Sequence, residues 1–371
     1  MPSERKLAAE LGVSRATIQA AIREVEAWGL VRCEPNCRPR VISGRSTTSK
    51  EAGRRASQIA IWMLPDLQDL GGTMILQGIR AAFGSHRYRL LFGCPPSHER
   101  AILEAAEVEF FHSLVNNADI AGALVWDTGT RGCRRAYQAL AAAKVPLVFI
   151  DREPLMPIAT DVVAVDNRRA ARSAVRHLTS LGHTRIAMVI EHERVSSVRE
   201  RIDGYEAALR EAEIPLSGHY ILELSSTEAA AEIVQSERLI TSMLSMKEPP
   251  TALFAVNDRA ALNLLEAARR LGISVPEQLS IVGFDGLLRW LPGGGELTTV
   301  AQPFEEIGRA AAQRLLERIG SSTADVPRHI LLDAPLVIKA STGAPLVTSL
   351  SQRATRVQGE SYAKPQGIHA D

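Results

Sequence analysis

From residue 58 onward, short apolar runs alternate along the chain with amphipathic segments. The apolar runs are 59–64, 88–92, 120–126, 146–150, 162–165, 185–190, 251–256 and 280–284. Segments with helical spacing of apolar residues lie between them, for example 73–84, 132–143, 168–181, 200–213 and 258–271. Strands that are buried on both faces have continuous apolar runs, so this alternation predicts parallel sheets that helices cover on both faces.

This alternating region, residues 58–345, is long for a single doubly wound sheet. We therefore expect an α/β body of two similar lobes, each with its own parallel sheet. In open sheets of this kind, ligands bind beyond the carboxyl ends of the strands. The sequence thus predicts a ligand cleft where the strand ends of the two lobes face each other.

Before residue 58 the pattern changes to two short helices and a hairpin. Residues 3–12 and 15–28 have helical spacing of apolar residues, and residues 30–31 and 41–42 predict two short strands. This order of elements is typical of a winged helix-turn-helix, whose second helix reads base edges with its N-terminal end. The exposed residues near that end are Ser14, Arg15, Thr17 and Gln19.

The charge distribution supports contact between this N-terminal segment and nucleic acid. Residues 1–56 contain 11 basic and 6 acidic residues, a net charge of +5, whereas the whole chain has a net charge of only +1. The rest of the chain is therefore mildly acidic. A small basic head on an acidic body predicts that the head binds DNA and that the body binds something else.

The sequence contains no signature of an enzyme or of a nucleotide cofactor. It has no GxGxxG after the first strand, no GxxxxGK[ST] and no GxSxG, so we expect no catalytic activity and no cofactor. His183 is more simply a residue that fixes a helix-to-strand loop than a catalytic base. Cys33 and Cys37 could form a metal pair, but no second Cys/His pair accompanies them at a zinc spacing.

No run of 18 apolar residues occurs, and the first thirty residues include four glutamates and no apolar core segment. We therefore expect neither a membrane span nor a signal peptide, and we predict a cytoplasmic protein with free thiols.

The N-terminal segment resembles the GntR-type winged-helix domain of bacterial transcription regulators along PSERKLAAELGVSRATIQAAIREVEAWGLV. The resemblance implies DNA contacts by Arg5, Ser14, Arg15 and Thr17. The alternative is that Arg5 and Arg15 are solvated surface charges. Two departures stand out: the family has a further helix before this segment, and Glu34–Pro39 replaces its glycine-rich wing tip. The first predicts that the functional chain starts upstream or that the head is truncated. Arg38 and Arg40 remain candidates for phosphate contact.

The body resembles the sugar-binding domain of the LacI/GalR regulators, which have the periplasmic-binding-protein fold. The matching segments include VPLVFIDRE, AVDNRRAARSAVRHLTSLGHTRIAMV, RERIDGYEAALREAEI, PTALFAVNDRAALNLLEAARRLGISVPEQLSIVGFD and LTTVAQPFEEIGRAAAQRLL. A GntR-type head on such a body is similar to the hybrid arabinose regulators. The resemblance implies that Arg201, Asn257 and Asp285 bind sugar hydroxyls. Weaker candidates are Gln302, Asp151 and Arg152.

The chemistry of these residues suits a sugar, because forked polar groups can bind two neighbouring hydroxyls. Alternatives stay open for two of them. Arg201, expected on the first turn of a helix, could instead form a salt bridge with Asp285 or Asp203. The pair Asn257–Asp258 could cap a helix, and we expect Asp258 to be the N-cap and Asn257 the ligand. The first loop, 66–72, departs from the family and leaves the sugar's identity open.

These observations predict a winged helix-turn-helix followed by a two-lobed periplasmic-binding-protein-like domain. The expected domains are a DNA-binding head at 1–43, a flexible linker at 44–57, the ligand-binding and dimerisation body at 58–345 and a disordered tail at 346–371. The expected function is a ligand-responsive repressor of carbohydrate genes that binds a DNA operator as a homodimer, with a sugar as effector. The alternatives are a soluble sugar-binding receptor of a transport system and an enzyme.

Overall fold

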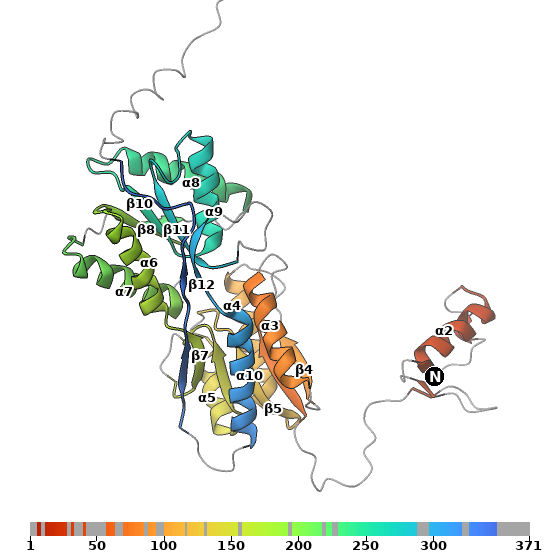
Figure 1. Ribbon diagram of the computed structural model, residues 1–371. Helices are drawn as coiled ribbons and strands as arrows, with labels where there is room; N and C mark the ends of the chain where they lie inside the picture. The colour runs from red at the N-terminus through yellow and green to blue at the C-terminus, as the bar shows by residue number, and fades with distance from the viewer. Residues whose placement is uncertain are drawn as a thin grey trace, which may run out of the picture. The chain divides into compact units, whose positions relative to one another are not determined.

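The computed structural model (Figure 1) describes residues 6–8, 12–27, 31–32, 40–41, 57–63, 70–84, 88–93, 100–115, 117–129, 132–154, 158–191, 195–216, 220–224, 229–287, 297–320 and 326–346. The predictions for Arg5, Arg38, the Cys33 and Cys37 pair, nearly all of the linker and the tail from residue 347 fall outside these residues. The chain divides into two compact units, Met1–Arg54 and Arg55–Asp371.

The N-terminal unit contains the predicted second helix and the hairpin. Helix α2 spans Arg15–Ala27, and the strands β1 (Val31–Arg32) and β2 (Arg40–Val41) pair antiparallel. The Ser14 hydroxyl accepts a hydrogen bond from the Thr17 amide at 3.1 Å, which satisfies an N–H group at the start of α2. Ile18 and Ile22 are buried, as the helical spacing predicts. The structure therefore confirms α2 and the hairpin, whose strands lie within one residue of the predicted ranges.

The first lobe of the body contains a six-stranded parallel sheet in the order β13-β7-β6-β5-β3-β4. Its strands are β3 (Gln58–Trp62), β4 (Arg89–Gly93), β5 (Ile120–Val125), β6 (Leu147–Ile150), β7 (Asp161–Val165) and β13 (His329–Leu332). One face packs on α3 (Leu70–Phe83) and α10 (Phe304–Gly320), the other on α4 (Arg100–Val115) and α5 (Arg134–Ala142). Alternate residues of β3 accordingly belong to different cores, with Ile59 and Ile61 facing α3 and Trp62 facing α4.

The second lobe repeats this arrangement in the order β14-β12-β11-β10-β8-β9. Its strands are β8 (Ile186–Glu191), β9 (Ile221–Leu224), β10 (Ala252–Ala255), β11 (Ser280–Asp285), β12 (Thr298–Ala301) and β14 (Leu336–Val337). Only β14 runs antiparallel to its neighbour. Helices α6 (Asn167–Ser180) and α7 (Ser196–Glu211) cover one face, and α8 (Ala229–Leu244) and α9 (Asp258–Arg270) cover the other.

The chain passes between the two lobes three times (Figure 1). It leaves the first lobe between β7 and α6, returns between β12 and α10, and leaves again between β13 and β14. Backbone hydrogen bonds join these passages: the Asp166 amide donates to the Leu332 carbonyl at 3.3 Å, and the Ala301 amide donates to the Pro335 carbonyl at 2.8 Å. The two-lobed α/β prediction is therefore confirmed.

Candidate functional site

Five of the six predicted ligand residues lie at or just after carboxyl ends of strands in the body, and the sixth, Arg201, lies on a helix. Asp151 and Arg152 follow β6 in the first lobe, whereas Asn257, Asp285 and Gln302 stand at or after the ends of β10, β11 and β12 in the second. Arg201 is the sixth residue of α7, so the expectation that it lies in the first turn is wrong by one turn. The helix begins earlier than predicted because Ser196 and Ser197 are already helical and buried.

Arg201 is buried, and neighbouring side chains and a backbone carbonyl hold its guanidinium group. Its Nε donates to Asn167 Oδ1 at 2.9 Å, and one terminal nitrogen donates to the Val256 carbonyl at 2.7 Å. The same nitrogen lies 3.9 Å from Asp285 Oδ1, and the guanidinium carbon lies 3.8 Å from the centre of the Phe284 ring. The salt-bridge alternative is thus correct for Asp285. It is wrong for Asp203, which pairs with Arg168.

Asp285 and Gln302 form a hydrogen-bonded pair next to Arg201. Gln302 Nε2 donates to Asp285 Oδ1 at 2.8 Å, and the Gln302 amide donates to the Asp285 carbonyl at 3.0 Å. Burial raises the pKa of Asp285 to about 8, although the Arg201 charge opposes the shift. The carboxyl group therefore holds its proton at neutral pH, so it can donate a hydrogen bond as well as accept one.

Asn257, and not Asp258, is the N-cap residue of α9. Asn257 is the N-cap of α9: its Oδ1 accepts from the Ala260 amide at 2.7 Å, and its Nδ2 donates to Glu191 at 3.0 Å. Asp258 is buried and accepts hydrogen bonds from Thr299 Oγ1 at 2.5 Å and from the Leu287 amide at 2.9 Å. The expectation that Asp258 is the cap is wrong, because Asn257 has the extended backbone of an N-cap residue.

Asp151 and Arg152 form the wall of the first lobe together with Trp126, which the sequence analysis did not single out. Asp151 has a positive φ of 65°, an uncommon backbone conformation for a non-glycine residue. Arg152 Nε lies 3.4 Å from Asp151 Oδ2, and its guanidinium carbon lies 5.1 Å from the centre of the Trp126 ring. Trp126 follows β5 directly, so the strand-end rule that selected the other residues could have found it.

The buried polar atoms that have no hydrogen-bond partner among the described residues include three on residues just after strand ends. They are Trp126 Nε1, Asp151 Oδ1 and Gln302 Oε1. Buried polar atoms are nearly always satisfied in folded proteins, so each such atom calls for a ligand or a water molecule. One donor and two acceptors therefore lie just after the carboxyl ends of β5, β6 and β12, in both lobes.

The two lobes touch beside this region. The Glu153 amide, after β6, donates to Ser196 Oγ at the start of α7 at 2.7 Å. Burial raises the pKa of Glu200 on the same helix, and the nearby Glu153 carboxylate raises it further. The ligand residues of the first lobe thus lie near those of the second, and Asp151 also contributes to the raised pKa of Asp285.

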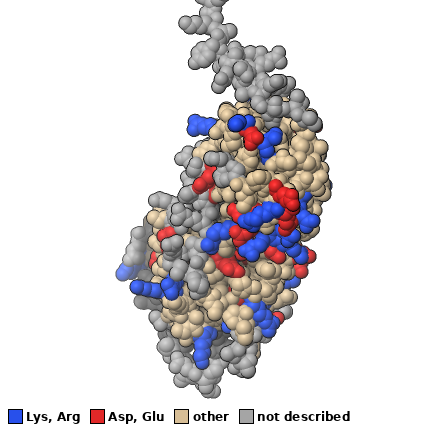
Figure 2. Space-filling model, turned by 90° about the vertical axis from the view of Figure 1, so that its left-hand side faces the viewer, with Lys and Arg blue, Asp and Glu red and all other residues tan. Residues whose placement is uncertain are grey.

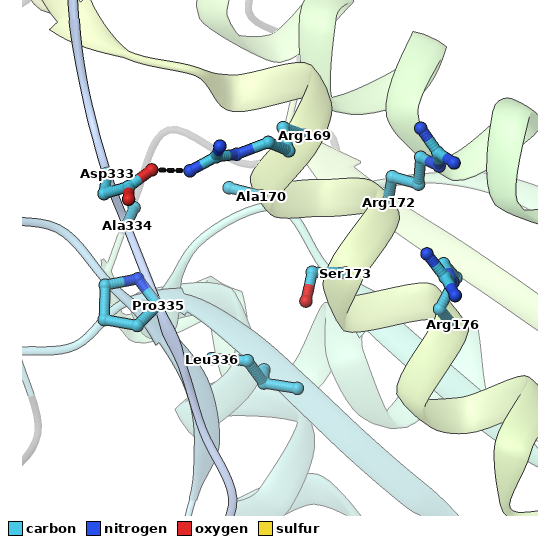
Figure 3. A pocket seen from close by; sticks show the side chains of 9 residues that line it. All are labelled: Arg169, Ala170, Arg172, Ser173, Arg176, Asp333, Ala334, Pro335 and Leu336. Atoms are coloured by element: carbon cyan, nitrogen blue, oxygen red, sulfur yellow. Dashed lines mark ion pairs between the residues drawn. The ribbon is translucent and has the colours of Figure 1, made fainter.

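A hollow of about 630 Å³ lies elsewhere, between α6 and the passage from β13 to β14 (Figure 3). Its basic side chains are Arg169, Arg172 and Arg176 on one side of α6. Arg169 pairs with Asp333 across the hollow, and Arg172 pairs with Glu211 on α7. Figure 2 shows basic and acidic side chains next to one another on one face of the body. These pairs offer no set of unsatisfied polar groups, so we do not assign the ligand site here.

In the head, Ser14, Arg15, Thr17 and Gln19 are all exposed at the start of α2. The Ser14 hydroxyl already caps the helix and lies 2.8 Å from Thr17 Oγ1. Arg40 lies on β2, but its side chain is outside the described part of the structure. The exposed end of α2 therefore presents the polar groups that the helix-turn-helix pattern predicts.

His183 has the structural position expected from the sequence. Its Nδ1 lies 2.8 Å from Thr251 Oγ1, and its Nε2 lies 2.9 Å from the Gly343 carbonyl and 3.1 Å from Ser280 Oγ. The ring therefore joins the loop after α6 to two strands of the second sheet and to the last described segment.

Within the described ranges, no helix has both the length and the apolar character needed to cross a membrane.

Comparisons with known proteins agree with both units. Residues 1–40 match the family of bacterial regulatory proteins of the gntR type, and residues 175–342 match the periplasmic binding protein-like domain. The HTH-type transcriptional regulator DegA of Bacillus subtilis is 30% identical over 299 residues, which are 80% of this chain and 83% of DegA. An arabinose metabolism transcriptional repressor of Geobacillus stearothermophilus is 26% identical, over 92% of this chain and 91% of its own.

Among solved structures, a LacI family transcriptional regulator from Enterococcus faecium with bound ribose has a similar fold. Its TM-score is 0.63 at 23% identity, and the match covers 78% of this chain and 99% of that one. The fold and the strand-end residues define a two-lobed ligand-binding body on a helix-turn-helix DNA-binding head. The chain belongs to the bacterial HTH-type transcriptional regulators, with a periplasmic binding protein-like body and a head of the gntR type.

Proposed function

We propose that this regulator is a cytoplasmic repressor of carbohydrate genes whose effector is a small sugar. The observation that carries the proposal is that Trp126 Nε1, Asp151 Oδ1 and Gln302 Oε1 are all buried without hydrogen-bond partners just after carboxyl ends of strands. A sugar hydroxyl both donates and accepts, so a polyol can satisfy a set that mixes a donor with acceptors. An apolar effector would leave all three atoms unsatisfied at a cost of about 1–3 kcal/mol each.

Arg201 and Asp285 complete the proposed site. Arg201 has five N–H donors, and the bonds to Asn167 and Val256 hold its plane fixed beside Asp285. A rigid donor next to a carboxyl group that can both donate and accept a hydrogen bond suits two adjacent hydroxyls. Asn257 and Arg152 have a positioning role in this scheme, since the former caps α9 and the latter contacts Trp126.

The effector acts on DNA binding through the arrangement of the lobes. A ligand bound by residues of both lobes binds the closed arrangement more tightly than an open one, and it therefore shifts the population toward closure. In a homodimer, closure changes the spacing of two heads on a pseudo-palindromic operator. The relative from Geobacillus stearothermophilus, named an arabinose metabolism repressor, supports the comparison with hybrid arabinose regulators.

The proposal also assigns the DNA contacts. Arg15, Thr17 and Gln19 read bases from the start of α2, whereas Arg5, Arg38 and Arg40 bind phosphate or the minor groove. The Ser14 hydroxyl contributes mainly as the helix cap. No catalytic role is proposed for any of these residues, and the GntR-type match over residues 1–40 favours a regulator over a transport receptor.

A thermal-shift screen with pentoses, hexoses and disaccharides tests the effector class, because a ligand that binds only the folded state raises the melting temperature. Asp285→Ala should weaken binding of the sugar identified in the screen about tenfold, since leaving the facing buried groups without a hydrogen-bond partner costs about 1–3 kcal/mol. Operator binding without sugar should persist in this variant. Wild-type affinity in both Arg201→Ala and Asp285→Ala would place the ligand elsewhere.

A further inference from the structure

Behind the first-lobe wall of the proposed site lies a buried carboxylate that none of the ligand contacts uses. Glu107, on α4, is completely buried. Its Oε2 accepts a hydrogen bond from the Thr128 hydroxyl, and its Oε1 accepts one from Tyr137 Oη at 3.2 Å. Burying a carboxylate is costly unless hydrogen bonds compensate it, so this arrangement needs a reason beyond packing.

The two bonds connect Glu107 to different parts of the lobe. Tyr137 is a buried residue of α5 that packs against Phe111 and Phe149, so its bond lies within the core. Thr128 belongs instead to the segment after β5 that carries Trp126 and Asp127. This bond is therefore a direct link from α4 to the segment that forms the first-lobe wall.

Several hydrogen bonds hold the segment 126–129. The Trp126 amide donates to the Trp62 carbonyl at 2.9 Å, and the Asp127 carbonyl accepts a long bond of 3.5 Å from Arg152. Asp127 Oδ2 accepts from the Gly129 amide within the segment itself, at 3.1 Å. The bond between Thr128 and Glu107 adds a link from this segment to α4, just beyond the residue whose indole N–H has no partner.

We propose that Glu107 is a positioning residue for effector binding: through Thr128 it fixes the 126–129 segment so that the Trp126 indole N–H faces the bound sugar. The proposal rests on the proposed sugar site. It predicts that the Thr128 bond controls effector affinity, whereas the Tyr137 bond to the same carboxylate contributes only to the stability of the fold.

Three variants separate these roles. Thr128→Val keeps the shape of the side chain and removes the hydroxyl, Thr128→Ser restores a hydroxyl, and Tyr137→Phe removes the other bond to Glu107. Each is titrated by calorimetry with D-ribose, L-arabinose and cellobiose and is unfolded thermally without sugar. We expect Thr128→Val to weaken binding about tenfold, the order expected from one bond to a charged group, and Thr128→Ser to restore it. Tyr137→Phe should lower the melting temperature without changing the affinity.

The reasoning is wrong if Thr128→Val and Tyr137→Phe lower stability alike and bind sugar like the wild type. If the wild type binds none of the three sugars, the proposed effector class fails, but the positioning role is still measured by hydrogen exchange. In that case the amides of 126–129 should exchange faster in Thr128→Val than in Tyr137→Phe. Equal exchange in the two variants would overturn the positioning role by itself.

Discussion

Replacing Asp285 by asparagine should stabilise the unliganded protein at neutral pH. Asp285 has its pKa raised to about 8 by burial, whereas the unfolded chain ionises near a pKa of about 3.9. The folded state therefore holds a proton that the unfolded state has lost between these two pH values. The stability associated with this proton is fully present below pH ~4 and is lost as the pH rises to about 8. Asparagine cannot ionise and avoids this loss.

The size of the effect follows from the gap between the pKa of the unfolded chain and neutral pH. About three pKa units at 1.36 kcal/mol each give an upper bound of about 4 kcal/mol at pH 7. Because 17% of the side chain is still exposed, solvent lowers the cost, and we expect about 2 kcal/mol. Asparagine also keeps an acceptor for Gln302 Nε2 and tolerates the φ of 128° at this position.

The measurement is the free energy of unfolding in urea at several pH values between about 5 and 8, for the wild type and Asp285→Asn, without sugar. The difference between the two should grow with pH, because other titrating groups cancel in the comparison. Asp203→Asn, which replaces an exposed carboxylate in the same lobe, is the control and should change stability by less than about 1 kcal/mol. A variant that is less stable than the wild type at every pH, or a difference that does not grow with pH, refutes the reasoning.

Three further predictions concern a buried ion pair in the core, the stability of the protein at acidic pH and the DNA contacts of the head. Arg314→Met should destabilise the protein by about 3 kcal/mol in urea unfolding. Arg314 and Asp161 are both 1% exposed and joined at 2.6 Å, so the variant leaves a buried carboxylate with weaker partners. A loss below about 1 kcal/mol would contradict this. Burial lowers the pKa of His183, so the folded state binds fewer protons than the unfolded state. The melting temperature should therefore fall as the pH drops below about 6.5. His183→Asn should reduce this fall, and the same dependence of melting temperature on pH in the variant would contradict the role of His183. In gel-shift assays, Arg15→Ala should relax operator preference, whereas Arg40→Ala should weaken binding to all DNA and reduce its salt dependence; unchanged selectivity in Arg15→Ala would exclude base readout by this residue.

The strands that could be predicted from the sequence are the central ones. β3, β5, β6, β8, β10 and β11 have apolar runs because neighbours and helices bury them on both sides. No strand was predicted for β9, β12, β13 or β14. Of these, β9, β13 and β14 lie at sheet edges, whereas β12 lies between β11 and β14; the edge strand β4 was predicted from its apolar run. The exposed residues that alternate along β13, such as His329 and Leu331, break the apolar pattern. Edge position therefore accounts for β9, β13 and β14 but not for β12, a short strand that begins with two threonines.

The candidate site was predictable at the level of strand ends but not at the level of contacts. The rule that ligands bind beyond strand ends led to Asp285 and Gln302, and it also applies to Trp126. It could not show that Asn257 caps α9, since a cap depends on backbone angles that the sequence does not specify. It also could not show that Asn167 and the Val256 carbonyl hold Arg201, because those partners are distant in sequence.

The three passages between the lobes affect how the protein can fold while it is being synthesised. The first sheet lacks its edge strand β13, and lacks the cover of α10, until residues 304–332 have been translated. On that helix Gly308 packs against the backbone of Ile75 on α3, so the early segment waits for a late one. A ribosome therefore releases nearly the whole body before either lobe can be complete. A nascent chain that stalls after β12 would expose the apolar face of α3, which makes this interval the one in which chaperones matter most.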